Sequence, residues 1–275
     1  MWHRKPVVAG SFYPASAEHL SGMIREYLDQ AAPTSLQGSI VGVISPHAGY
    51  IYSGPVAAYS YRQMDPDTEV VVVLAPSHRA RFRGASVIPE GEYETPLGST
   101  PIDAEIGNIL VTKPGFTFLK EAHQFEHSLE VQVPFLQTVL KKFSIVPIIV
   151  GTTELSVCRT LASAIADVLR NEKRSHAIVI STDLSHYHSY RSAQSMDGEF
   201  IDALKSFDVD AVQDIVCSGK AEACGEGPIL TGMIAAKELG ATGVEILKYA
   251  NSGDTAGDKN QVVGYVSAAM VREPS

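Results

Sequence analysis

Five consecutive apolar residues at positions 70–74, Val-Val-Val-Val-Leu, constrain the fold more than any other stretch of this sequence. A strand without polar alternation must be buried on both faces, as in a parallel sheet that helices cover on either side. Similar apolar runs occupy residues 40–45, 145–150 and 177–181, and segments with helical spacing separate them. The alternation predicts the α/β class, as a three-layer αβα sandwich around a mostly parallel or mixed central sheet.

Length and composition bound the domain organisation and exclude several classes of partner. The chain has 275 residues, of which 45% are hydrophobic, so we expect one domain over residues 1–275 with a sizeable core. A net charge of -9 without a basic block argues against a nucleic-acid surface, and no window reaches the ~20 apolar residues of a membrane helix. Three cysteines without paired spacing indicate a reducing, cytoplasmic location rather than a disulfide framework.

Apolar spacing and the positions of proline and glycine predict the remaining elements. Pro55 suits the first turn of a helix that begins at Ser53 or Gly54, and Pro134 must kink or break a helical pattern over residues 126–141. Glycines and prolines between 79 and 101 indicate short strands and turns. The other predicted helices span residues 15–30, 103–111, 154–169, 192–206, 209–217 and 229–239, and two closing strands span 244–250 and 261–270.

Two of the apolar strands end in the same way, with a proline followed by a histidine. These histidines are His47 in Ser-Pro-His and His78 in Pro-Ser-His, and a third strand runs into Asp183 and His186. Ligands of open α/β sheets bind beyond the carboxyl ends of the strands, so parallel pairing would gather the four residues at one edge. Imidazole is a good ligand for iron, copper or zinc, and the repeated construction favours a metal site over two unrelated structural histidines.

The polar residues of the third strand end have two interpretations. Asp183 could cap the following segment in an Asx turn, or it could orient or ligate at the site. His186 is a candidate proton carrier, because imidazole titrates near neutrality.

The segment His123-Gln-Phe-Glu-His127 matches the H-x-x-E-H pattern of some zinc peptidases. Five residues in a chain with nine histidines are weak evidence for that activity, so a zinc peptidase is only a minor alternative. The favoured interpretation is that Glu126 begins a helix and that Glu126 and His127 project toward the His47 and His78 site as acid/base candidates.

Cys224 lies in a glycine-flanked loop, Ala-Cys-Gly-Glu-Gly-Pro, in front of a predicted helix. A helix N-terminus lowers the pKa of a thiol and makes it a better ligand or nucleophile. The alternative is a small buried apolar residue, which is the favoured interpretation for Cys158 and Cys217 inside helical patterns.

Eight motifs that follow one another along nearly the whole chain resemble the Memo family, whose prokaryotic members are called AmmeMemoRadiSam system protein B. They are Val-Ala-Gly-Ser-Phe-Tyr-Pro14, Ser-Pro-His-Ala-Gly-Tyr50, Ala-Pro-Ser-His78, Glu-His-Ser-Leu-Glu-Val-Gln132, Ser-Thr-Asp-Leu-Ser-His186, Cys-Gly-Glu-Gly-Pro228, Ser-Gly-Asp254 and Val-Val-Gly-Tyr265.

The resemblance implies the fold of the class III extradiol, LigB-like non-haem iron dioxygenases. In those enzymes two histidines and a glutamate hold Fe(II), and His47 and His78 match the two histidines. The third metal-associated position of the Memo family is a cysteine, which falls on Cys224, while Asp183 and His186 match polar groups of the same cleft. A thiolate is softer than a carboxylate and favours copper(I) or zinc, so ring-opening activity does not follow from the fold.

Two classes of function remain open. One is a metal-dependent, dioxygenase-like redox enzyme with metal at His47, His78 and Cys224, Fe(II) first and copper or zinc as alternatives. The other is a non-catalytic module that binds a small molecule, a peptide or a protein in the same cleft, with Tyr50, Tyr52 and Tyr187 as recognition groups. The family name associates its prokaryotic members with an AMMECR-type protein and a radical SAM protein, which are the expected partners if there are any.

Overall fold

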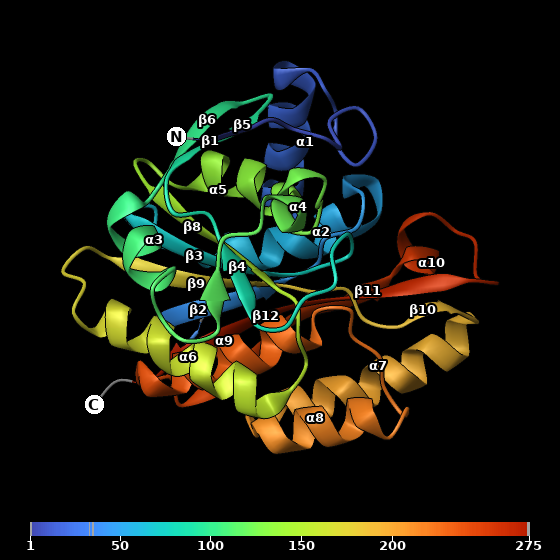
Figure 1. Ribbon diagram of the computed structural model, residues 1–275. Coiled ribbons are helices and arrows are strands. Elements are labelled where there is room, and N and C mark those ends of the chain that lie inside the picture. Colours follow the sequence, from blue (N-terminus) through green and yellow to red (C-terminus); the bar gives the residue numbers. More distant parts are fainter. Residues whose placement is uncertain (1, 33, 35, 274–275) are drawn as a thin grey trace.

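The computed structural model describes residues 2–32, 34 and 36–273, and a 12-stranded mixed sheet runs through its centre (Figure 1). The strands are β1 (Trp2–Arg4), β2 (Ser39–Ser45), β3 (Val70–Pro76), β4 (Ala85–Val87), β5 (Gly91–Thr95), β6 (Gly98–Ile102), β7 (Phe116–Thr117), β8 (Ser144–Val150), β9 (His176–Ser181), β10 (His186–His188), β11 (Gly243–Asn251) and β12 (Val262–Arg272). The main path is β1-β5-β6-β8-β3-β9-β2-β12-β10. Its middle, β8-β3-β9-β2, is parallel, and β12 pairs antiparallel with β2.

Helices cover both faces of this sheet, as expected for the three-layer class. They are α1 (Ala17–Gln30), α2 (Tyr50–Tyr61), α3 (Ala104–Leu110), α4 (Lys120–Gln124), the 3-10 turn η1 (Glu130–Gln132), α5 (Val133–Val139), α6 (Leu155–Arg170), α7 (Tyr190–Lys205), α8 (Val209–Cys217), α9 (Glu226–Glu238) and α10 (Ser252–Thr255). In Figure 1, α1, α2, α4 and α5 lie above the sheet, and α6, α7, α8 and α9 lie below it.

The strand β3 shows why the apolar run at its centre predicts two covered faces. Its alternate residues enter different cores: Val72 packs with the layer of α6 and α9, whereas Val71 and Val73 pack with the layer of α1 and α2. All seven residues of β3 are buried. Across the described part of the chain, no helix combines the length and apolar character that crossing a bilayer requires.

In two of the predicted helices the difference from the observed helix involves a proline. Helix α2 begins at Tyr50 rather than near Gly54, so Pro55 lies inside the helix and not in its first turn. The predicted helix over 126–141 is shorter in the structure, because the chain forms only the turn η1 before α5, where Pro134 occupies the first turn. Glu126 and His127 therefore lie in a loop, not on a helix.

The parallel strands β2, β3 and β9 bring three chain segments to one edge of the sheet. β9 lies between the other two, with Ser181 level with Ser45 of β2 and Ile180 level with Leu74 of β3. His47 and His78 follow the outer strands by two residues each, so they flank the end of β9. The gathering of these groups at one edge is the arrangement that the sequence predicts.

Candidate metal centre

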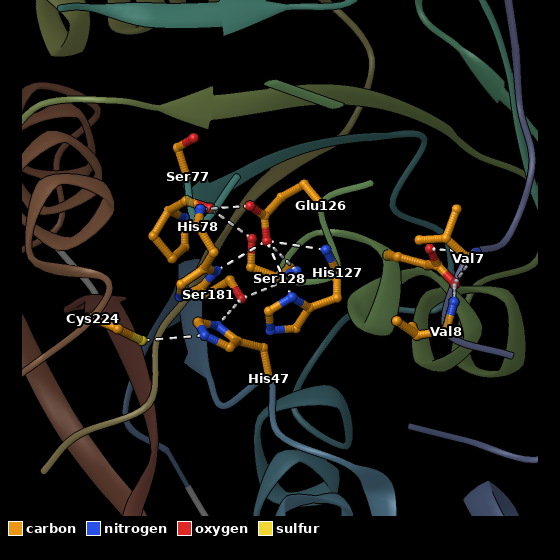
Figure 2. A network of polar contacts seen from close by, with 12 residues as sticks. Val7, Val8, His47, Ser77, His78, Glu126, His127, Ser128, Ser181 and Cys224 are labelled. Atoms are coloured by element: carbon orange, nitrogen blue, oxygen red, sulfur yellow. Dashed lines mark hydrogen bonds and ion pairs between the residues drawn. The ribbon is translucent and has the colours of Figure 1, made fainter. Parts of the chain in front are cut away.

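Three histidines converge at this edge and form a group that could hold a metal ion, the one such group among the described residues. One ring nitrogen from each of His47, His78 and His127 lies within 4.8 Å of the others (Figure 2). The His47 side chain is 3% exposed and the His78 side chain is 32% exposed, with His127 between them at 17%. The group is therefore anchored in the protein on one side and accessible on the other.

The open side faces a cavity of about 820 Å³. All three histidines of the group line it, and so do Asp183 and His186. The remaining wall is partly aromatic, with Phe12, Tyr52, Tyr187 and Tyr265.

The carboxylate of Glu126 orients two of the three histidines from behind. Its Oε2 accepts a hydrogen bond from the backbone N–H of His78 at 2.6 Å. Its Oε1 lies 2.9 Å from His78 Nδ1. The same Oε1 accepts the backbone N–H groups of His127 and Ser128, each at 3.0 Å. Burial acts to raise the pKa of Glu126, but these hydrogen bonds outweigh it and lower the pKa to about 2. Glu126 is buried and is not among the residues that line the cavity.

His47 is held by different groups, although its sequence context repeats that of His78. Its backbone N–H donates to Asp183 Oδ1 at 2.8 Å, and its Nδ1 lies 2.8 Å from the hydroxyl of Ser181. Burial lowers the pKa of His47 well below the ordinary value, and burial lowers the pKa of His127 to about 4. Both rings are therefore neutral at pH 7, which is the form that binds metals.

Cys224 contacts the ring of His47 through its Nε2 (Figure 2). Its Sγ lies 3.1 Å from His47 Nε2 and accepts the backbone N–H of Asp183 at 3.2 Å. Burial and the neighbouring Asp183 carboxylate raise the pKa of the thiol, so the expected lowering by the start of α9 is not what this environment produces. Cys224 lines a second cavity of about 400 Å³ instead of the large one.

The other predicted acid/base groups lie on the wall of the large cavity. Burial raises the pKa of Asp183 to about 7, and burial lowers the pKa of His186. The backbone N–H of His186 donates to Glu222 at 3.1 Å, which fixes the strand β10 beside the cavity.

The structure separates the two histidines of the H-x-x-E-H segment. His123 lies on α4, where its Nε2 contacts Ser86 Oγ at 2.9 Å, and α4 ends at Gln124 before His127 is reached. Because the pattern needs both histidines on one helix, the zinc-peptidase alternative loses its geometric basis.

The structure confirms only part of what the sequence predicts for the tyrosines and cysteines. Tyr50 is a core residue, 2% exposed, whose hydroxyl donates to Val131 O, while Tyr52 and Tyr187 do line the cavity. All three cysteines are free; Cys158 is buried as expected, but Cys217 is exposed.

Ser181 and Gln132 are parts of the site to which the sequence analysis assigns no role. Ser181 Oγ contacts His47, and Gln132 Nε2 donates to Ser181 Oγ at 2.8 Å. The sequence offers one indication for each residue. Ser181 is a polar residue at the end of an apolar strand, and Gln132 is an amide within the apolar stripe from Leu129 to Leu136.

The fold and the site together define an α/β protein with a histidine-lined cleft at one sheet edge. Comparison with known proteins then gives the family. The family model described as Memo-like protein matches residues 4–269. MEMO1 family proteins of Methanopyrus kandleri and Thermotoga maritima are each 38% identical, over 98% and 97% of this chain and 99% of both relatives. The relative from Nitrosopumilus maritimus is 37% identical over 95% of this chain and 97% of its own length. The chain belongs to the Memo family.

A solved structure shares the fold at low sequence identity. An uncharacterized protein from Escherichia coli K12 aligns with a TM-score of 0.51 and 16% identity, over 76% of this chain and 88% of that one. This likeness supports the architecture.

Proposed function

We propose that this Memo-family protein binds a transition-metal ion through His47, His78 and His127 and acts as a dioxygenase-like redox enzyme on a small molecule in the adjoining cavity. Fe(II) is the ion proposed first, with copper or zinc as alternatives, and Cys224 is the candidate for an additional ligand. The observation that carries the proposal is the convergence of three imidazoles within 4.8 Å beside a cavity of about 820 Å³.

The residues present fit such an ion. His47 and His78 each direct Nδ1 to an oxygen of the protein, at 2.8 and 2.9 Å, which leaves the other ring nitrogen of each for the ligand site. A bound ion would supply a Lewis acid and, if it is iron or copper, a redox centre. The chain would contribute His186 and Asp183 as proton-transfer groups on the cavity wall, with Glu126 holding His78 and His127 in place.

Elemental analysis of protein purified without oxygen tests this proposal. We expect stoichiometric metal in the wild type and a loss of affinity of at least about tenfold in His47→Ala, His78→Ala and His127→Ala. The exposed His19 on α1 provides the matched control, so His19→Ala should keep its metal. Cys224→Ser tells whether the thiol is a ligand.

Oxygen consumption with a panel of catechols then tests the redox activity. A wild type without metal, or metal loss in His123→Ala but not in His47→Ala, would contradict the ligand assignment. Metal binding without oxygen consumption would favour the second candidate.

That second candidate is a binding module that uses the same cavity for a peptide or partner protein. Its specific support is Tyr187, which lines the cavity and is 69% exposed. The backbone of Tyr187 has a φ of 62°, a conformation that is uncommon outside glycine. A partner of the AMMECR or radical SAM type is proposed here from the family name, and co-purification with tagged wild type and Tyr187→Ala would test it.

A further inference from the structure

A buried chain of hydrogen bonds reaches His47 from the side away from the cavity. It starts at Tyr61 in α2, passes through Gln132 in η1 to Ser181 at the end of β9, and ends at His47 Nδ1. All four side chains are at most 3% exposed. With so little water access, the direction of each hydrogen bond is decided by the protein groups themselves.

The amide of Gln132 can be oriented in only one way. Its Nε2 lies 3.0 Å from the carbonyl oxygen of Pro46, which can only accept, so Nε2 must be the atom on that side. The same Nε2 then donates to Ser181 Oγ at 2.8 Å. Its Oε1 faces the other way and accepts the hydroxyl of Tyr61 at 2.5 Å.

The direction of the Ser181 hydroxyl proton follows from the partners of the hydroxyl. Its single proton goes to the carbonyl oxygen of Ser128 at 2.7 Å, again a group that can only accept (Figure 2). One lone pair of Oγ takes the N–H of Gln132, so the contact with His47 Nδ1 at 2.8 Å must be filled by a proton on that nitrogen.

We infer that Gln132 and Ser181 are positioning residues that hold His47 in the Nδ1–H tautomer and keep its Nε2 unprotonated for the ligand site. The nearest contact of Nε2 agrees, because a thiol proton on Cys224 can be donated to it across 3.1 Å. The carboxylate of Asp183, which would favour a proton on Nε2, lies beyond hydrogen-bond distance at 3.9 Å. The tautomer itself follows from the hydrogen bonds, while its effect on metal affinity rests on the proposed function. His78 reaches the same tautomer by a different route, since the carboxylate opposite its Nδ1 can only accept.

Two-bond ¹H–¹⁵N correlation spectra of the metal-free protein at pH 7.5 test the inference directly, with His47→Gln used to assign the His47 ring. We expect one Nδ1–H tautomer in the wild type. Ser181→Ala removes the acceptor and should populate the Nε2–H tautomer, and its Kd for Zn²⁺ should rise about 10–100-fold. Gln132→Met leaves the Ser181 hydroxyl in place and should give a smaller change of the same sign.

Ser86→Ala is the matched control, because Ser86 is also buried and its Oγ contacts the ring of His123 at 2.9 Å. It should lower stability without changing the His47 resonances or the Kd. A wild-type His47 in the Nε2–H form would overturn the inference, and so would a Ser181→Ala variant with an unchanged tautomer. If Ser181→Ala does not fold, the wild-type and Gln132→Met spectra still decide. Failure of the wild type to bind Zn²⁺ with the expected tautomer present would overturn the proposed metal site and leave the positioning role supported.

Discussion

The ends of β2 and β3 share one construction, a strand, a proline and a histidine, yet the structure holds the two histidines by different chemistry. His78 is 32% exposed and is tied to a carboxylate, with Glu126 receiving both its backbone N–H and its ring. His47 is 3% exposed and is tied to a neutral hydroxyl, with its backbone N–H donated to Asp183. In both cases the end of the strand places the ring, and the partner at Nδ1 leaves Nε2 free.

The two partners differ because a buried charge needs more hydrogen-bond donors than a buried neutral group does. An ionised carboxylate is stable in the interior only when enough donors satisfy it, and Glu126 has three backbone N–H groups and one ring nitrogen. Ser181 sits where a donated Gln132 N–H, an accepting carbonyl and the His47 ring already meet. A neutral group completes that network without a buried charge.

The largest effect on stability is expected from removing the Glu126 carboxylate, which holds His78. Glu126→Ala leaves the N–H groups of His78, His127 and Ser128 without their acceptor, and we expect a loss of about 3–5 kcal/mol in the free energy of unfolding. Urea denaturation of the metal-free protein measures it. Glu154→Ala is the control, since that carboxylate pairs with Arg83 at the surface and its loss should cost far less stability than the loss of Glu126. Equal losses in the two variants would refute the anchoring role of Glu126.

A smaller effect is expected from displacing Cys224 beside His47. Gly225 has an ordinary negative φ, but a Cβ there would lie 2.5 Å from the carbonyl oxygen of Ser181 and 2.5 Å from the side chain of Thr182. Gly225→Ala must therefore push the Cys224 loop away from β9, at a cost of about 1–3 kcal/mol. If Cys224 is a ligand, the Zn²⁺ affinity should fall as in Cys224→Ser.

The resonances of His78 should stay unchanged in Gly225→Ala, because the perturbation lies on the His47 side. Gly198→Ala in α7, where a Cβ meets open space, should be neutral or slightly stabilising. Perturbed His78 resonances together with an unchanged His47 would show that the two strand ends are not independent in the way the comparison supposes.

Much of this edge was predictable because parallel strands carry their carboxyl ends to one place. The apolar run of β3, the repeated proline and histidine, and Asp183 at the end of β9 give the layer order and three of the groups at the site. The motifs gave the Memo family, which the family model confirms. The metal roles of His47, His78 and Cys224 and the catalytic roles of the other groups stay predictions.

The partners of the histidines were not predictable in the same way. Glu126 is 48 residues from His78, and Gln132 is 49 residues from Ser181, so neither pairing follows from local spacing. The helical pattern over 126–141 also masked the loop that carries Glu126 and His127, because apolar spacing does not reveal where backbone donors turn toward a buried carboxylate.

The smallest expected effect concerns a third strand end, where a second buried carboxylate has fewer donors than Glu126. Asp197 of α7 accepts the N–H of Ser185 beyond β9 at 3.0 Å and the hydroxyl of Tyr249 at 2.7 Å. Burial raises the pKa of Asp197 because these two bonds, with Glu222 nearby, do not offset the lost hydration.

The folded state therefore binds the Asp197 proton more tightly than the unfolded state does. The stability that this proton contributes is complete below the ordinary aspartate pKa of about 3.9 and is lost as the pH rises through the higher folded value. Asn at this position can accept from Ser185 and donate to Tyr249. Asp197→Asn should therefore gain on the wild type as the pH rises above about 4, by about 1.4 kcal/mol for each unit by which the folded pKa exceeds 3.9. Urea denaturation at several pH values measures the gain. The contrary result is a difference in the free energy of unfolding between the two proteins that stays the same at every pH. It would mean that two donors suffice for Asp197 where Glu126 has four. The number of donors would then not decide how a buried carboxylate titrates at this edge.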